Sequence, residues 1–321
     1  MDLIYMNSAF EDVGVITDAS MDVAIGKDEN DFKCEMALEK HCCGEGFYLY
    51  YEGTEYGGVI DAITIDTGSK EVAYSGRTWH GILASKVICP DDGEAYLKVS
   101  GEANSVLGML IERLGLSSLF SASNEDSGIK ISPYKMNRYI DGYSGIKKML
   151  KSEGAKLKFN FIKGKVILSA ESRVDYSKDE QFDSDQIEFK IKKTYAPINH
   201  CICLGAGNLT EREVIHLYAD SQGNISHTQS ITGIAERTAV YENSNVESTE
   251  ELEEGGIDTI KDSWNSDDVD FNFDSDAESY DIGDLVGAKE QTTGISVSAE
   301  ITKKIIKIDK GKTKISYKVG D

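Results

Sequence analysis

The feature that most constrains the fold of this 321-residue chain is a match of its sequence to itself. Residues 63–74 read ITIDTGSKEVAY and residues 306–317 read IKIDKGKTKISY, so the two segments align without a gap. In each segment, aliphatic residues at alternate positions flank a glycine, which is typical of a β-hairpin with one packed face. Hairpins draw on a small set of residues, so a chance similarity is the alternative. If the repeat is genuine, the chain carries one small β-domain near each end.

Between the repeats, the sequence predicts helices and a compact α/β segment. Thr78 can cap a short helix that ends before Pro90, and Asn104 can cap a longer helix that ends at Gly115. Residues 128–172 follow a β-α-β-β pattern. The chain has 30 glycines and only 3 prolines, a balance that suits many tight turns and few rigid linkers.

The formal net charge of −22 is concentrated in one stretch. Residues 241–284 contain sixteen Asp or Glu and one Lys, whereas residues 285–321 contain eight Lys and four acids. We interpret the acidic stretch as a solvated insertion with a short helix at residues 248–254, which Gly255 and Gly256 end. An acidic balance argues against binding of the phosphate backbone, which depends on clusters of Lys and Arg, so we expect no sequence-specific binding of nucleic acid.

These patterns predict an α+β, mainly β fold with two similar β-barrel-like domains and an α/β insert domain. We expect a first β-barrel-like domain at 1–90, a helical and α/β insert at 91–180, a second β-barrel-like domain at 181–240 with 280–321, and an acidic insertion at 241–279.

No run of residues approaches the roughly 20 apolar residues of a membrane span. The acidic N-terminal sequence lacks the basic region that opens a signal peptide. We therefore expect the chain to fold in the cytoplasm of the cell that makes it, with its six cysteines as reduced thiols.

Three segments resemble the siphophage tail-hub family, the tail-associated or baseplate-hub proteins that also occur in prophages. They are VAYSGRTWHGILASKVI (72–88), NHCICLGAGNLTEREVIHLYADSQGNI (199–225) and the blocks YDIGDLVGA, GISVSAEITKKIIKI and KISYKVG within 280–320. The resemblance runs over nearly the whole chain in order. It implies a homotrimer whose two barrels form a pseudo-hexameric ring, which joins the tail tube or distal tail ring to the three-fold tip.

The resemblance also implies the partners and the location. The partners would be the distal tail or tail tube protein, the C-terminal end of the tape-measure protein, and a tip or fibre protein. The protein would act in the virion tail tip, or baseplate, after assembly in the bacterial host cytoplasm. The sequence ends at the second barrel, so we expect any lytic or receptor-binding role to belong to another chain.

The chemical motifs predict no catalytic residue, cofactor or metal. Gly205 and Gly207 follow an apolar strand, but Thr210 stands where a dinucleotide loop needs its third glycine, and Thr210 with Glu213 fits a capping box better. Two Cys/His groups lack zinc-site spacing, which favours buried thiols on strands. These groups are His200 with Cys201 and Cys203, and Cys34 with His41, Cys42 and Cys43.

Two further motifs have ordinary structural explanations. The acidic residues of segment 268–276 resemble a calcium loop, but Phe273 and Ser279 stand where such a loop needs Gly and Glu. A strand with Phe271 and Phe273 on one face explains the pattern, and a weak calcium site stays open. Residues 76–80, GRTWH, fit a strand-to-helix junction whose Trp79 packs into the core. The residues of the calcium-like segment are Asp268, Asp270, Asn272, Asp274 and Asp276.

Two alternative functions compete with the structural one. The first is a cell-wall-degrading tail protein in which Cys42 or Cys43 acts with His80. The second is an acidic adhesion module that depends on calcium.

Overall fold

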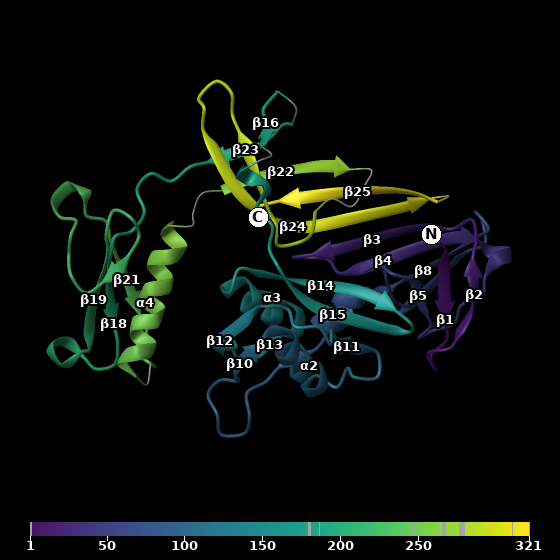
Figure 1. Cartoon of the computed structure of the whole chain (residues 1–321), viewed down its shortest axis with the longest axis horizontal. Helices are drawn as coiled ribbons and strands as arrows, with labels where there is room; N and C mark the ends of the chain where they lie inside the picture. The colour runs from purple at the N-terminus through teal and green to yellow at the C-terminus, as the bar shows by residue number, and fades with distance from the viewer. Residues whose placement is uncertain are drawn as a thin grey trace. The chain divides into compact units, whose positions relative to one another are not determined.

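The computed structural model describes residues 2–178, 181–185, 187–246, 248–264, 268–275, 280–309 and 311–320. Its contacts divide the chain into two compact units. Unit 1 comprises Met1–Phe189, Asp270–Gln291 and Ser298–Asp321, and unit 2 comprises Lys190–Val269 and Thr292–Val297. The fold is mainly β with four helices among the described residues, so the predicted α+β, mainly β class is confirmed (Figure 1).

The strands β1 to β8, most of them short, precede the first α-helix. They are β1 (Leu3–Met6), β2 (Asp12–Ile16), β3 (Ser20–Gly26), β4 (Asp31–Ala37), β5 (Tyr48–Tyr51), β6 (Gly57–Val59), β7 (Ala62–Asp66) and β8 (Glu71–Arg77). The α/β part follows with α1 (Trp79–Ala84), β9 (Val87–Ile88), β10 (Lys98–Glu102), α2 (Ala103–Arg113), β11 (Phe120–Ala122), β12 (Lys130–Lys135), β13 (Ile140–Asp141), α3 (Gly142–Ser152), β14 (Ala155–Ile162) and β15 (Lys165–Ser172).

The remaining strands belong either to a long sheet or to unit 2. The strands β16 (Gln181–Asp183), β17 (Lys190–Lys192), β22 (Asp268–Ser275), β23 (Leu285–Lys289), β24 (Ser296–Asp309) and β25 (Lys312–Val319) belong to the long sheet described below. Unit 2 contains β18 (His200–Leu204), β19 (Val214–Ala219), β20 (Ile225–Ser226), β21 (Thr238–Glu242) and α4 (Thr249–Trp264).

The helices of the α/β part begin close to where the sequence places them. Thr78 caps α1 by accepting a hydrogen bond from the Gly81 amide, as predicted. The cap of α2 differs from the prediction, because Glu102 accepts the amides of Asn104 and Ser105. The side chain of Asn104 instead donates to the Glu125 carbonyl and accepts from the Ala170 amide. A long-range role for this side chain explains why a local capping rule misplaced it. None of the described helices has the length and apolar character needed to cross a bilayer.

A ten-stranded sheet contains both copies of the sequence repeat. Its main path runs β17-β22-β25-β24-β3-β4-β8-β7, and Figure 1 shows β25, β24, β3 and β4 side by side. The order β7-β8-β4-β3 at one end recurs as β24-β25-β22-β17 at the other. The strands correspond in chain order as well, with β3, β4, β7 and β8 matching β17, β22, β24 and β25. The repeat in the sequence is therefore also a repeat in topology.

The two repeated hairpins differ in the length of their turns and therefore in register. Ile63 lies opposite Tyr74 in the first hairpin, whereas Lys304 lies opposite Tyr317 in the second. The first hairpin pairs Asp66 with Glu71, so its connection is two residues longer than that of the second. A register shift of two residues keeps every side chain on its original face, so the packed pattern survives.

The compact units do not follow the boundaries expected from the sequence. Residues 1–90 and 280–321 meet in one sheet, because β24 pairs with β3 from Lys303 opposite Gly26 to Asp309 opposite Ser20. The residues between β17 and β22 of the second repeat form most of unit 2, and this unit takes in most of the segment expected as an acidic insertion. The hydrophobic periodicity of a strand depends on its own residues, whereas the identity of the strand that pairs with it does not. The observed units therefore differ from the boundaries expected from the sequence.

Unit 2 is a four-stranded sheet, in the order β20-β19-β18-β21, with α4 against one face (Figure 1). The prediction that Gly255 and Gly256 end the helix is wrong, because α4 continues to Trp264. A Cβ on Gly255 would lie 2.3 Å from the Tyr241 ring, and one on Gly256 would lie 2.2 Å from Cys203 Sγ. These glycines therefore allow close packing of the helix on the sheet.

We expect Gly256→Ala to destabilise unit 2 by about 1–3 kcal/mol, because its methyl group overpacks the contact with Cys203. Gly108→Ala in α2 is the matched control, since its Cβ would meet nothing closer than Ala122 at 3.7 Å. The control should gain up to about 1 kcal/mol from helix propensity. Urea unfolding followed by tryptophan fluorescence separates the units, because Trp264 lies in unit 2 and Trp79 in unit 1. A neutral Gly256→Ala variant would contradict the packing argument.

Candidate functional site

The long sheet has one buried face and one polar face. Side chains of directly paired residues point to the same face of a sheet, so the strand registers assign each strand's faces. The buried face carries Met21, Val23, Ile25, Phe32, Cys34, Met36, Val72, Tyr74, Ile306, Ile308, Ile315 and Tyr317. Because both repeats contribute to this face, they share one continuous core layer.

The polar faces of the two repeated hairpins carry different charges. The aligned positions have Thr64, Asp66, Glu71 and Ser75 in the first hairpin and Lys307, Asp309, Lys314 and Lys318 in the second. Lys307 lies 3.7 Å from Asp22, and Lys314 lies 2.6 Å from Asp274, so neighbouring strands partly neutralise these lysines. The two hairpins therefore share backbone geometry but present distinguishable surfaces.

The sheet ends at β7, whose outer edge has no partner strand among the described residues. Ile65 on this strand is 54% exposed, although its equivalent Ile308 is buried. Exposed edges with apolar side chains are templates for pairing with another chain. This edge is thus a candidate contact surface.

A buried ionic group lies where β24 meets the N-terminal part. Lys304 is almost fully buried on β24, and its Nζ lies 2.5 Å from a carboxylate oxygen of Glu55. His80 on α1 lies 3.3 Å from the other oxygen of Glu55. Burial would raise the pKa of Glu55, but the charge of Lys304 and the hydrogen bond from His80 outweigh it and hold the pKa below its usual value. Burial also lowers the pKa of His80.

A second ionic group ties the α/β part to the second repeat. Lys156 on β14 donates to Asp281 at 2.7 Å and to both oxygens of Asp284 at 2.9 Å. Asp284 also accepts the Val174 amide, so the bonds enclose its carboxylate from two sides. Both ionic groups connect segments that are far apart in sequence.

The fold resembles solved structures, while the sequence gives no match. No family model and no curated protein matches the chain by sequence. The 43 kDa tail protein of prophage MuSo2 from Shewanella oneidensis aligns with a TM-score of 0.57 and 12% identity over 99% of this chain and 98% of its own. Prophage tail protein gp18 from Listeria monocytogenes aligns with a TM-score of 0.56 and 11% identity over 99% and 94%. A tail protein from Neisseria meningitidis gives 0.52 and 11% over 100% and 96%.

The chain has the fold of prophage tail proteins. The likeness extends over nearly the whole of each chain, so it includes the repeats and the α/β part together. The resemblance predicted from the sequence is confirmed at the level of fold.

The N-terminal cysteines and His80 make separate contacts among the described residues. Tyr74 accepts the amides of Cys42 and Cys43 through its hydroxyl oxygen, and His41 lies 2.9 Å from the same oxygen. Burial raises the pKa of Cys43, so its thiolate is disfavoured. Burial likewise raises the pKa of Cys34 to about 12. His80 contacts Glu55, Tyr143 and Phe159.

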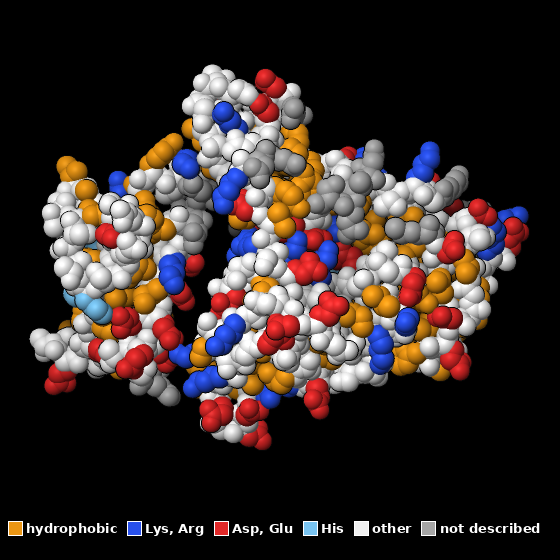
Figure 2. Space-filling view, in the orientation of Figure 1, with side chains coloured by type: hydrophobic (Ala, Val, Ile, Leu, Met, Phe, Trp, Pro, Cys, Tyr) orange, Lys and Arg blue, Asp and Glu red, His pale blue; other side chains and the backbone are white. Residues whose placement is uncertain are grey.

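The Cys/His group of unit 2 is divided between the two faces of its sheet. Cys201 and Cys203 are buried and pack with α4. His200 points to the other face, where its ring nitrogens lie 2.7 Å from Glu236 and 2.8 Å from His216. Sequence spacing missed this histidine pair, although cross-strand pairing of β18 with β19 brings the two together. Figure 2 shows histidine side chains at the surface of this unit.

The remaining motifs serve packing. Trp79 is fully buried and stacks on Phe161 at 5.1 Å, which confirms the predicted junction. The capping box predicted for Thr210 and Glu213 is wrong, because the turn at Leu209–Glu211 has no side-chain cap and Glu213 accepts from Thr249 instead.

The dinucleotide and calcium motifs also lie in ordinary secondary structure. Gly205 and Gly207 lie in the connection after β18. Phe271 and Phe273 are buried on β22, as predicted for a strand, while Asp276 lies outside the described residues. In the part of the chain that the structure describes, no group of three acidic, His or Cys side chains is arranged to hold a metal ion.

We expect Glu55→Gln to destabilise the fold by about 3–5 kcal/mol at neutral pH, because it removes the nearest counter-charge of the buried Lys304 and leaves Asp281 at 4.0 Å. Glu29→Gln is the control, because Glu29 pairs with Lys303 at an exposed position and should cost about 1 kcal/mol or less. Since the folded-state pKa of Glu55 is depressed, its contribution is present above about pH 4.3 and is lost at lower pH. Urea titrations should therefore show the two proteins converging in acid. A difference that is constant with pH would contradict this assignment.

Proposed function

We propose that the chain is a structural tail hub or baseplate protein of a phage, a prophage or a phage-tail-like particle. Three copies would form a pseudo-hexameric ring that joins the tail tube or distal tail ring to the tip. The observation that carries the proposal is the recurrence of one four-strand order within the sheet of a single chain. The fold likeness to prophage tail proteins supports it.

The duplicated strand order gives three chains a way to meet both symmetries. Three subunits carry six similar hairpins. Each of the six subunits in a six-fold partner ring can therefore contact one of these hairpins. The charge difference between the hairpins, with Glu71 in the first and Lys314 in the second, reduces the same surface to three-fold symmetry. A three-fold tip can therefore bind the alternate hairpins. A closed ring of this kind requires heterologous contacts between unlike surfaces of neighbouring subunits.

The exposed edge of β7 is our proposed ring contact. It would pair with an unlike surface of the next subunit and so remove an unpaired edge from solvent. The other proposed partners are the distal tail or tail tube protein, the C-terminal end of the tape-measure protein, and a tip or fibre protein. The proposed location is the tail tip of the virion, after assembly in the bacterial host cytoplasm.

Neither alternative function has a specific observation in its favour. A cysteine hydrolase needs an activated thiol beside a base, whereas burial raises the pKa of Cys43 and His80 contacts Glu55 instead. The calcium-dependent module would use the acidic segment around Asp274, and this side chain pairs with Lys314. We therefore propose a role without catalysis.

We expect three chains of 35.3 kDa, about 106 kDa together, at high protein concentration. Ile65→Lys should abolish the trimer, because it places a charge on the β7 edge without disturbing a buried residue. Ile162→Lys is the matched control at another exposed isoleucine and should leave the trimer intact. Light scattering after size exclusion measures all three proteins. A chain that stays monomeric at every concentration and with isolated tail rings would refute the proposal.

A further inference from the structure

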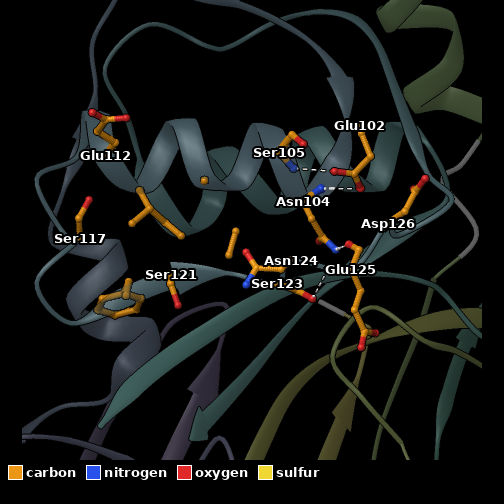
Figure 3. A pocket seen from close by; sticks show the side chains of 14 residues that line it. Glu102, Asn104, Ser105, Glu112, Ser117, Ser121, Ser123, Asn124, Glu125 and Asp126 are labelled. Atoms are coloured by element: carbon orange, nitrogen blue, oxygen red, sulfur yellow. Dashed lines mark hydrogen bonds between the residues drawn. The ribbon is translucent and has the colours of Figure 1, made fainter. Parts of the chain in front are cut away.

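An open groove lies in the α/β part of unit 1, away from the long sheet. It runs between α2 and β11, and its cavity volume is about 750 Å³. In Figure 3, α2 passes along one side and the strand that contains Ser121 along the other. Glu112 lies at one end of the groove, and Glu125 and Asp126 lie at the opposite end.

One wall of the groove is the free edge of a sheet. The strand β11 lies at the edge of the order β11-β15-β14 and is parallel to β15. The Leu119 carbonyl and the Ser123 amide bond to β15, so in a parallel ladder the Ala122 amide and carbonyl point away from it. Among the described residues, no hydrogen bond to the Ala122 amide or carbonyl is found on this outer side. The edge therefore offers a donor and an acceptor to an added strand.

The floor and the rim of the groove differ in character. Ile111 and Phe120 are buried beneath it, and Gly108 and Ala122 are small lining residues. Every charged residue that lines the groove is acidic, and the lining includes no Lys, Arg or His. The lining acids are Glu102, Glu112, Glu125 and Asp126. The side chains of Glu112 and Glu125 have no hydrogen bond or ion pair among the described residues.

Hydrogen bonds within the chain hold the walls of the groove in place without a ligand. The Glu102 carboxylate accepts the Ser127 hydroxyl and the amides of Asn104, Ser105 and Ser127, and these bonds hold its pKa at about 2 against the effect of burial. Asn104 in turn bonds to the Glu125 carbonyl and the Ala170 amide. These bonds join α2 to the loop at residues 125–127, so little ordering remains to oppose binding.

We propose that this groove binds an extended, basic segment of a partner protein, which adds to β11 as a further strand. The free edge supplies main-chain hydrogen bonds to the added strand. Every second side chain of that strand contacts the apolar floor, and the acidic rim selects Lys or Arg. The groove lies on the α/β part and uses no residue of the repeats, so this binding is separate from ring formation.

The probe is a fluorescent peptide of about seven residues that alternates lysine and valine, which matches the length of an ordinary strand. We expect saturable binding below about 1 mM, which weakens as salt is added. The Ala122 amide should gain protection from hydrogen exchange. Two comparison peptides test the chemistry, one with glutamate in place of lysine and one with methylated backbone nitrogens. Both should bind at least about fivefold more weakly, because they lose charge attraction or main-chain bonds.

Two variants test the location. The double variant Glu112→Lys with Glu125→Lys should weaken binding at least about fivefold. Its control, Asp92→Lys with Glu94→Lys, makes the same charge change at exposed positions that do not line the groove and should bind normally. Gly108→Leu should block the groove without loss of helix stability, because leucine is a better helix former than glycine. Circular dichroism checks that each variant folds.

The proposal is overturned if the peptide shows no saturable binding, if the methylated or acidic peptide binds equally well, or if both groove variants bind normally. Binding of a neutral oligosaccharide in place of the peptide would also overturn it. If the protein forms a trimer but does not bind the peptide, only the groove proposal is contradicted. If it stays monomeric but binds the peptide, only the ring proposal is contradicted.

Discussion

The pairing of β24 with β3 is the interaction on which the rest of unit 1 depends. It joins two sets of strands from opposite ends of the chain into one sheet, with Ile306 opposite Val23 and Ile308 opposite Met21 on the buried face. Lys304 enters the same face and is neutralised there by Glu55. A buried charge is tolerated only with such a partner, so this ion pair constrains the register in which the two repeats meet.

The repeat illustrates how far local sequence information reaches. Alternating side chains identified the hairpins at Ile63–Tyr74 and Ile306–Tyr317 and their packed faces, because a strand's periodicity depends only on its own residues. The order of the strands was beyond reach, since it depends on which edges meet. The sequence predicts too short a helix for α4, because a glycine such as Gly256 is typical of a helix end. In the structure, the absence of a side chain at Gly256 allows the close contact of α4 with Cys203.

The candidate surfaces were accessible from the sequence only in part. The opposite charges of the repeated hairpins can be seen in the alignment once the faces are known. The groove beside β11 could not be predicted, because Glu112 and Glu125 lie on separate elements and Ala122 is informative only through its backbone. The pairing of His200 with His216 likewise arises from strand register.

We propose that one duplicated strand order lets three chains imitate six. Electron cryo-microscopy of the assembled ring tests it most directly. We expect three chains whose β7–β8 and β24–β25 hairpins alternate around the axis at equal radius, in six similar positions. A ring with another number of chains, or one in which the two hairpins lie at different radii, would contradict the claim.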